Sequence, residues 1–170
     1  MFDFSKAVDA PIFSLKLGMK EVNSIACSHF IPQLFVAGGV DRRLWIIDSA
    51  TQKVDLAAAG DHNAPISKVV WHPRNKSQLA TCANDGRVLF YDLSARGKKV
   101  VLDLQAQTPV LTIDFNKYND LFAVGSVDST IRIYDLRNPA KPIFVLSGHK
   151  YGVSKLKFSP MDPNLLLSGS

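Results

Sequence analysis

The chain has 170 residues, a formal net charge of +5 at pH 7 and two cysteines. Its apolar stretches are shorter than the ~18 residues that a membrane-spanning helix needs, and its acidic N-terminus lacks the apolar core of a secretory signal, so we expect a cytoplasmic protein without membrane insertion. Lysines and arginines are scattered, and the one basic run, residues 96–99, is more typical of a solvated loop than of a nucleic-acid-binding site.

The first predicted element is a short strand at residues 11–15, whose sequence PIFSL is similar to PIFVL at residues 142–146. Because the later copy forms the last strand of a repeat unit, we interpret residues 1–20 as the end of a preceding unit. The chain is therefore expected to be a fragment of a longer protein that contains more units.

Four units with a common pattern follow, and the last of them is incomplete. We place them at residues 21–64, 65–108, 109–151 and 152–170. Each contains an apolar strand in the same phase, which starts at Val22, Ile66, Val110 or Val153. A unit of about 40–45 residues with four short strands is typical of one blade of a WD-repeat β-propeller. The sequence therefore predicts an all-β fold, an incomplete arc of about four four-stranded blades, because a closed propeller has about 4–8 of them.

A tight turn with an aspartate recurs between the second and third predicted strands of each complete unit. The turn aspartates are Asp41, Asp85 and Asp128, which lie 44 and 43 residues apart. Small residues precede each turn, among them Gly38 and Gly125, and they are typical of strands that pack closely near a propeller axis.

A histidine precedes the turn aspartate of the second unit by 23 residues, since His62 stands before Asp85. His149 has the corresponding place in the fourth unit. We predict that this histidine and the aspartate form a hydrogen bond that fixes the turn, and we favour this structural role over catalysis. The third unit has Ala106 at the histidine position, so we expect turn amides to hold Asp128 instead.

Motifs for catalysis or cofactor binding do not occur in the sequence: there is no GxSxG elbow, HExxH helix, phosphate-binding loop or glycine-rich dinucleotide turn. Acidic residues do not pair outside the turns, so no two carboxylates can share acid and base roles. Cys27 and Cys82 lie in apolar strand patterns, and we expect buried free thiols rather than a disulfide or a zinc site. The sequence therefore predicts a binding protein without enzymatic activity, cofactor or metal.

The loops at one face of a propeller can hold a peptide or a helix. In this chain we expect that face to consist of the aspartate turns and of the segments that lead into each first strand. The candidate peptide-binding residues there are Glu21, Arg42, Asp61, Asn84, Val127, Ser129, Lys150 and Tyr151.

Residues 110–170 resemble the peroxisomal type-2 targeting-signal receptors, the peroxin-7 family of WD-repeat proteins. The shared sequence elements are NKYN at residues 116–119, SVD at 126–128, DLRN at 135–138, GHxYxV at 148–153 and KFSP at 157–160. Residues 1–109 match that family only as generic WD repeats.

The resemblance implies a non-enzymatic receptor that binds the N-terminal type-2 signal of peroxisomal matrix proteins such as thiolase. It also implies an import co-receptor and the peroxisomal docking complex as partners, and a cytoplasmic protein that cycles to the peroxisome. Such a signal is an amphipathic helix with a basic residue, which favours an apolar groove beside carboxylates. Near the expected face the available acids are Glu21 and Asp61, and the apolar contacts are Val127 and Tyr151.

An alternative interpretation belongs to another class of protein, a WD-repeat scaffold subunit of a multiprotein complex of the histone-binding, coat or signalling type. Such proteins also contain DLRN and FSP elements, and a fold alone does not fix a function. Nucleic-acid binding is disfavoured, because aromatic and basic residues do not alternate as they do in stacking platforms.

Overall fold

The computed structural model of the chain describes residues 21–94, 99–106 and 108–170. All regular secondary structure in these ranges is β-strand, and none of these residues lies in a helix. The same ranges contain no helix that is long and apolar enough to cross a membrane. The strand predicted at residues 11–15 lies outside the described residues, as does most of the basic run at residues 96–99.

The strands form three four-stranded antiparallel sheets and one two-stranded sheet, each built from consecutive strands. The first sheet contains β1 (Val22–Cys27), β2 (Leu34–Gly39), β3 (Arg43–Asp48) and β4 (Lys53–Ala59). The second contains β5 (Ile66–Trp71), β6 (Gln78–Ala83), β7 (Arg87–Asp92) and β8 (Lys99–Gln105). The third contains β9 (Val110–Phe115), β10 (Leu121–Ser126), β11 (Thr130–Asp135) and β12 (Phe144–Ser147), and the fourth contains β13 (Lys155–Phe158) and β14 (Leu166–Gly169). This repeated order confirms the predicted all-β arc of blades.

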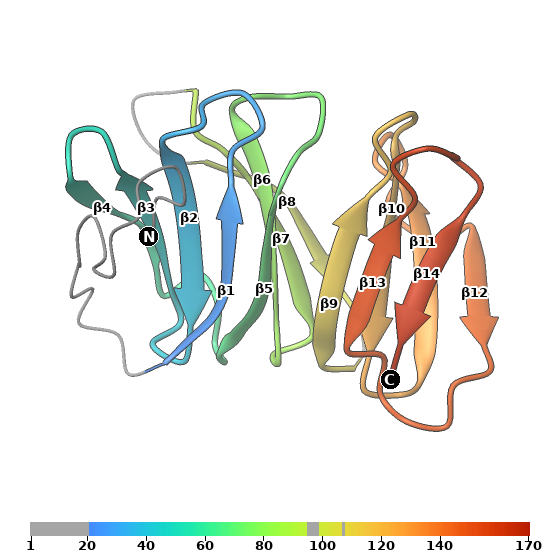
Figure 1. Ribbon diagram of the computed structural model, residues 1–170. Coiled ribbons are helices and arrows are strands. Elements are labelled where there is room, and N and C mark those ends of the chain that lie inside the picture. Colours follow the sequence, from blue (N-terminus) through green and yellow to red (C-terminus); the bar gives the residue numbers. More distant parts are fainter. Residues whose placement is uncertain (1–20, 95–98, 107) are drawn as a thin grey trace, which may run out of the picture.

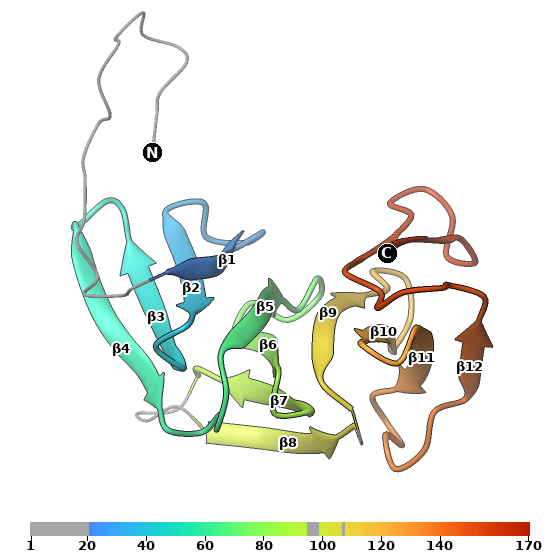
Figure 2. The same ribbon diagram turned by 90° about the horizontal axis from the view of Figure 1, so that it is seen from below.

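The sheets follow one another around an arc, with β1, β5 and β9 on its inner side and β4, β8 and β12 on its outer side (Figure 2). Because successive strands alternate in direction, equivalent connections gather at one face. We call the face with the turns at residues 40–42, 84–86 and 127–129 the turn face, which is at the bottom of Figure 1. The opposite loop face, at the top of Figure 1, carries the loops at residues 28–33, 72–77, 116–120 and 159–165.

Apolar cores fill the spaces between neighbouring sheets, because strands in the middle of a blade are covered on both faces. β6 and β10 are accordingly short runs of small and apolar residues that are buried along almost their whole length. The core between the first and second sheets includes Val36, Val69 and Leu89, whereas Val153 and Leu156 belong to the core between the third and fourth.

A cluster of aromatic rings lies between the second and third sheets. Phe122 of β10 is fully buried, and its ring centroid lies 5.1 Å from that of Phe90, 5.2 Å from that of Tyr134 and 6.3 Å from that of Phe115. Phe122 stacks on Tyr134 and meets the edge of Phe90, and both arrangements are favourable for aromatic pairs. The cluster joins β7 of one blade to β9, β10 and β11 of the next.

Two glycines let neighbouring sheets approach closely. A β-carbon at Gly38 would lie 2.8 Å from Cγ2 of Ile66, and one at Gly125 would lie 2.9 Å from Cγ1 of Val153. Carbon atoms do not approach one another so closely without strain. The small residues before the turns are therefore required by the packing of one sheet on the next.

Polar side chains also link the inner strand of one unit to that of the next. Asn23 donates from Nδ2 to the Ile66 carbonyl oxygen at 2.9 Å, and the hydroxyl of Ser24 accepts the amide of Val69 at 3.2 Å. The indole of Trp71 donates back to the Ala26 carbonyl at 3.2 Å. Each bond joins residues 43 or 45 positions apart, so the repeat of the sequence is also the repeat of the contacts.

The two cysteines differ in environment. Cys82 is fully buried in β6, and burial raises the pKa of its thiol well above the ordinary value. Cys27, at the end of β1, is exposed, so the prediction of two buried thiols is wrong for this residue. The cause is its position. Ala26 packs toward the second sheet, so Ile25 and Cys27 lie on the opposite face of the first sheet. Among the described residues no sheet packs on that face (Figure 2), and Ile25 is accordingly 59% exposed.

Candidate functional site

The turn face is built from three turns of the same geometry. In each turn the residue after the aspartate has a positive φ, 61° for Arg42, 80° for Gly86 and 65° for Ser129. This backbone conformation is unfavourable for residues other than glycine. The aspartate compensates by accepting a hydrogen bond from the amide two residues later, at 3.0 to 3.1 Å. Each turn is thus stabilised by a hydrogen bond between two of its own residues.

The second unit fixes its turn through a buried histidine. His62 is 2% exposed, its Nδ1 lies 3.1 Å from Oδ2 of Asp85 and its Nε2 lies 2.7 Å from Oγ1 of Thr81. Burial lowers the pKa of His62 below 6.5, despite the opposing effect of the Asp85 carboxylate. The neutral ring therefore donates from Nδ1 to Asp85 and accepts the hydroxyl proton of Thr81, which leaves neither nitrogen free for a reaction. In the fourth unit Nε2 of His149 similarly lies 2.8 Å from the hydroxyl of Ser168.

Where this histidine is absent, another side chain supplies the donor. In the first unit the indole of Trp45 donates to Asp41 at 3.0 Å, and in the third the guanidinium of Arg132 donates to Asp128 at 2.6 Å. Both donors stand four residues after the aspartate. In the unit with the histidine this position is taken by Leu89, which is fully buried.

The hydrogen-bond donors of Asp128 therefore differ from the prediction, which named only turn amides. One amide, that of Thr130, donates at 3.1 Å, but Arg132 and the hydroxyls of Thr108 and Thr130 supply the other bonds. The reason is the strand period, which directs residues 130 and 132 to the side of the sheet on which the turn carboxylate lies. Burial disfavours the ionised form of Asp128, but hydrogen bonds from Arg132 and Thr130 outweigh it and lower the pKa to about 2.

We expect Arg132→Met to weaken the third unit at neutral pH but not in acid. The ionised Asp128 stabilises the fold above the ordinary aspartate pKa, and this contribution is lost as the pH falls toward about 2. Removal of the guanidinium should lower the free energy of unfolding by about 1 kcal/mol at neutral pH, a value reduced for solvent screening. Urea unfolding as a function of pH measures the effect. Arg137→Met is the matched control, because it removes a guanidinium that is 74% exposed beside Asp135, whereas the Arg132 side chain is 20% exposed. An equal loss in both variants would contradict the prediction.

The eight candidate residues follow the turn face from the first unit to the fourth. Those that are exposed are Glu21, Arg42, Asn84, Val127, Lys150 and Tyr151, and those that are partly buried are Asp61 and Ser129. Some have structural partners: the Asn84 amide oxygen accepts the hydroxyl of Ser67 at 3.1 Å, and the Asp61 carbonyl accepts the guanidinium of Arg87. The candidates therefore lie along the arc and are not gathered in one pocket.

Val127 and Tyr151 are the two candidates that expose substantial apolar surface, 49% and 75% of each residue. They lie on adjoining segments where the third and fourth units meet. The amide of Val153 donates to the Ser126 carbonyl at 3.0 Å, and a β-carbon at Gly152 would lie 3.1 Å from Cα of Val127. The backbone that carries both side chains is thus fixed to the core. We refer to Val127 and Tyr151 as the apolar pair.

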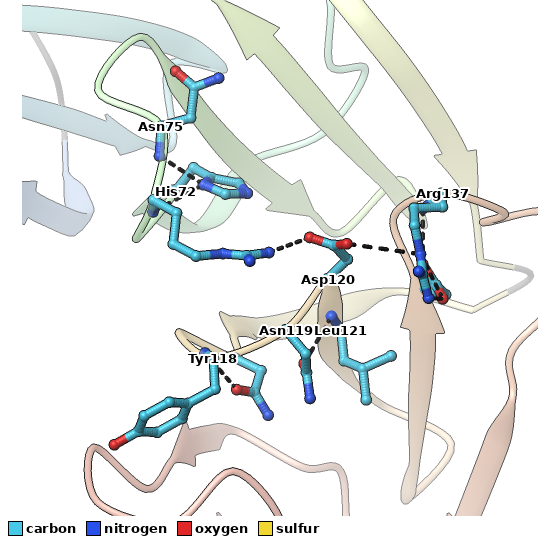
Figure 3. A network of polar contacts seen from close by, with 10 residues as sticks. His72, Asn75, Tyr118, Asn119, Asp120, Leu121 and Arg137 are labelled. Atoms are coloured by element: carbon cyan, nitrogen blue, oxygen red, sulfur yellow. Dashed lines mark hydrogen bonds and ion pairs between the residues drawn. The ribbon is translucent and has the colours of Figure 1, made fainter.

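The loop face carries a network of polar contacts between the second and third units (Figure 3). Asp120 binds the guanidinium of Arg74 from the preceding unit and lies 3.7 Å from Nε of Arg137. Nδ1 of His72 accepts the amides of Arg74 and Asn75, which shapes the loop that presents the arginine. The Arg74 and Asp120 side chains are 42% and 38% exposed, so water screens their attraction. The network aligns two loops and contributes little to stability.

A groove that no sequence motif marks lies at the loop-face end of the inner strands. Asp114 of β9 is 6% exposed; its Oδ1 lies 2.9 Å from Nζ of Lys157, and its Oδ2 accepts the amide of Phe158 at 2.8 Å. The only signal in the sequence is an acid inside the apolar strand VLTIDF. Its partners stand 43 and 44 residues later, so the packing of one unit on the next is needed to reveal them.

The described part of the chain offers few groups for metal binding or nucleophilic attack. Within it, no group of three or more histidine, cysteine, aspartate and glutamate side chains could hold a metal ion. The turn aspartates are occupied by hydrogen bonds, and the raised pKa of the Cys82 thiol makes it a poor nucleophile.

Comparison with known proteins gives a family match. The profile of the "WD domain, G-beta repeat" family matches residues 56–92, 98–135 and 140–170. The chain is 33% identical to protein NEDD1 of Homo sapiens over 115 residues, which cover 68% of this chain and 17% of that protein. It is 29% identical to histone acetyltransferase type B subunit 2 of Eremothecium gossypii over 115 residues, 67% of this chain and 26% of that protein. It is 23% identical to the histone-binding protein MSI1 of Saccharomyces cerevisiae over 164 residues, 95% of this chain and 39% of that protein. The chain thus spans well under half the length of these relatives.

Proposed function

This chain belongs to the WD domain, G-beta repeat family, and we propose that it is a non-enzymatic scaffold that binds other proteins within a multiprotein complex. One observation carries the proposal: the turn face has turns fixed by internal hydrogen bonds, and beside them it exposes the apolar pair. A preorganised surface loses little conformational freedom on binding. Exposed tyrosine is also among the residues that contribute most to binding at protein interfaces.

The histone-binding type is the first partner class to test. Two of the relatives compared above are named as a histone-binding protein and as a histone acetyltransferase subunit. Among the candidate residues of the turn face, Glu21 and Asp61 are the acids that a basic partner would meet, and Arg42 and Lys150 oppose it. The charges of these four candidates cancel, so the apolar pair is the feature that would anchor a partner.

The test is binding of purified core histones to the wild-type chain and to a Val127→Ser/Tyr151→Ala double variant, measured by calorimetry. Loss of two partly exposed apolar anchors should weaken binding by about tenfold or more. The matched control is Tyr118→Ala, which removes another exposed tyrosine, on the loop face. If the double variant bound histone as tightly as the wild type, the turn face would not be the binding surface. If the wild type did not bind histone, the histone-binding class would be excluded.

A receptor for the type-2 peroxisomal signal is the second candidate. What favours it is the GHxYxV element at residues 148–153, which resembles that receptor family and contains Tyr151 of the apolar pair. It would bind thiolase-type cargo together with an import co-receptor and would cycle between cytoplasm and peroxisome. The same variants measured against an N-terminal type-2 signal peptide, with and without co-receptor, distinguish the two candidates. Binding of the peptide but not of histone would favour the receptor.

A further inference from the structure

The groove at the loop-face end of the inner strands consists of two adjoining hollows of about 280 and 270 Å³. They share four lining residues, His29, Trp71, Asp114 and Lys157. One hollow opens among the loops of the loop face, and the other extends down the inner strands to Lys68. The groove is therefore formed by four successive units and is separate from the turn face.

The floor of the groove is apolar and rigid. Trp71, Phe115 and Phe158 line it and are 5%, 6% and 7% exposed. The Trp71 indole is held by its hydrogen bond to the Ala26 carbonyl, and the Phe158 backbone is held by Asp114. An apolar side chain placed on this floor would be removed from water without rearrangement of the protein, which favours binding.

The walls of the groove carry a surplus of positive charge. The charged lining residues are three lysines, Lys68, Lys117 and Lys157, and one acid, Asp114. Both oxygens of Asp114 are engaged, one by Lys157 and one by a backbone amide. Among the described residues, Lys68 and Lys117 take part in none of the ion pairs. Nζ of Lys117 lies 4.8 Å from the centroid of the Tyr118 ring, a contact that leaves its charge uncompensated. Two cationic side chains thus line the groove without a carboxylate partner among these ion pairs.

We propose that this groove binds an acidic segment of a partner protein. Carboxylates of the segment would pair with Lys68 and Lys117, and an apolar side chain between them would cover the Trp71 and Phe115 floor. Single-stranded nucleic acid fits less well, because a base stacks on a whole exposed aromatic face. Only a few per cent of each aromatic residue is exposed here, an area that one small apolar side chain can cover. The site holds a partner different in charge from a histone, and it does not rest on the function proposed for the turn face.

The test uses a short fluorescein-labelled peptide that alternates glutamate and leucine, and fluorescence anisotropy with the whole chain. We expect the Lys68→Glu/Lys117→Glu variant to bind the peptide about tenfold more weakly or worse, since each lost pair contributes a few-fold. The matched control is Lys53→Glu/Lys141→Glu, which makes the same charge change at exposed positions outside the groove and should alter affinity less than about twofold.

Further variants and competitors test the proposal in the same assay. Lys68→Met/Lys117→Met removes the charges and keeps the aliphatic stems, so it should also weaken binding while leaving the thermal midpoint unchanged. Tyr151→Ala on the turn face should bind the peptide like the wild type, which separates this site from the proposed function. Equal binding of a lysine–leucine peptide, equal loss in the control variant, or displacement of the peptide by an equimolar oligouridylate would each overturn the proposal.

Discussion

Phe122→Ala is expected to lower the free energy of unfolding by about 3–5 kcal/mol, the range for truncation of a buried phenylalanine. Phe122 is fully buried, and it is the ring that contacts Phe90 of the preceding blade as well as Tyr134 and Phe115 of its own. Alanine would leave a cavity where two sheets meet, and the rings around it can close that space only partly.

Urea or thermal unfolding followed by circular dichroism measures this loss. Phe30→Ala is the matched control, because Phe30 is 47% exposed on the loop face and its truncation should cost less than about 1 kcal/mol. Similar losses in the two variants would mean that the cluster does not hold the second and third blades together.

His62→Ala should cost about 2–3 kcal/mol, because it leaves buried polar groups without partners. The Thr81 hydroxyl, which is fully buried, loses its acceptor. Asp85 keeps the amides of Asn63 and Arg87, which limits the damage at the turn. The loss is measured as the change in unfolding free energy near neutral pH, with His29→Ala, an exposed histidine, as the control.

The pH dependence gives this prediction a second readout. The folded pKa of His62 lies below 6.5 because the ring is buried. The unfolded chain therefore binds a proton that the folded chain resists, and stability falls as the pH drops below 6.5. In His62→Ala this part of the loss is absent, so its stability should vary less between about pH 7 and 5. An unchanged pH profile in the variant would contradict a neutral, buried His62.

The architecture could be predicted from the sequence, because the same residue pattern occurs in every complete unit. The spacing of Asp41, Asp85 and Asp128 predicts the number and order of the complete blades. Small residues such as Gly125 lie where neighbouring sheets approach each other closely. What the sequence did not reveal depends on a neighbour in space. Cys27 has an apolar sequence context, yet it is exposed, because it lies on the face of β1 opposite to Ala26, which packs toward the second sheet.

The hydrogen-bond donors of the turn aspartates were also predicted only in part. Because the third unit lacks the histidine, turn amides were expected to donate to Asp128, but Arg132 of the next strand donates to it as well. That substitute could have been recognised from the four-residue spacing, which Trp45 repeats in the first unit. The Asp114–Lys157 contact could not, since it requires the register of one blade against the next. Local rules thus account for the blades, and their juxtaposition accounts for the surfaces.

The side-chain links between units have a consequence for how the chain folds. Those on the inner strands and on the loop face join residues about one repeat apart, from 42 positions for Tyr118 and Pro160 to 47 for Asn116 and Pro163. Those on the turn face, such as His62–Asp85, span only about half a repeat. Such a molecule behaves as a nearly one-dimensional array, in which stability is a sum of units and of their nearest-neighbour interfaces. During synthesis on the ribosome each unit can then dock as soon as its successor emerges, and damage to one interface loosens the array next to it before it reaches distant units.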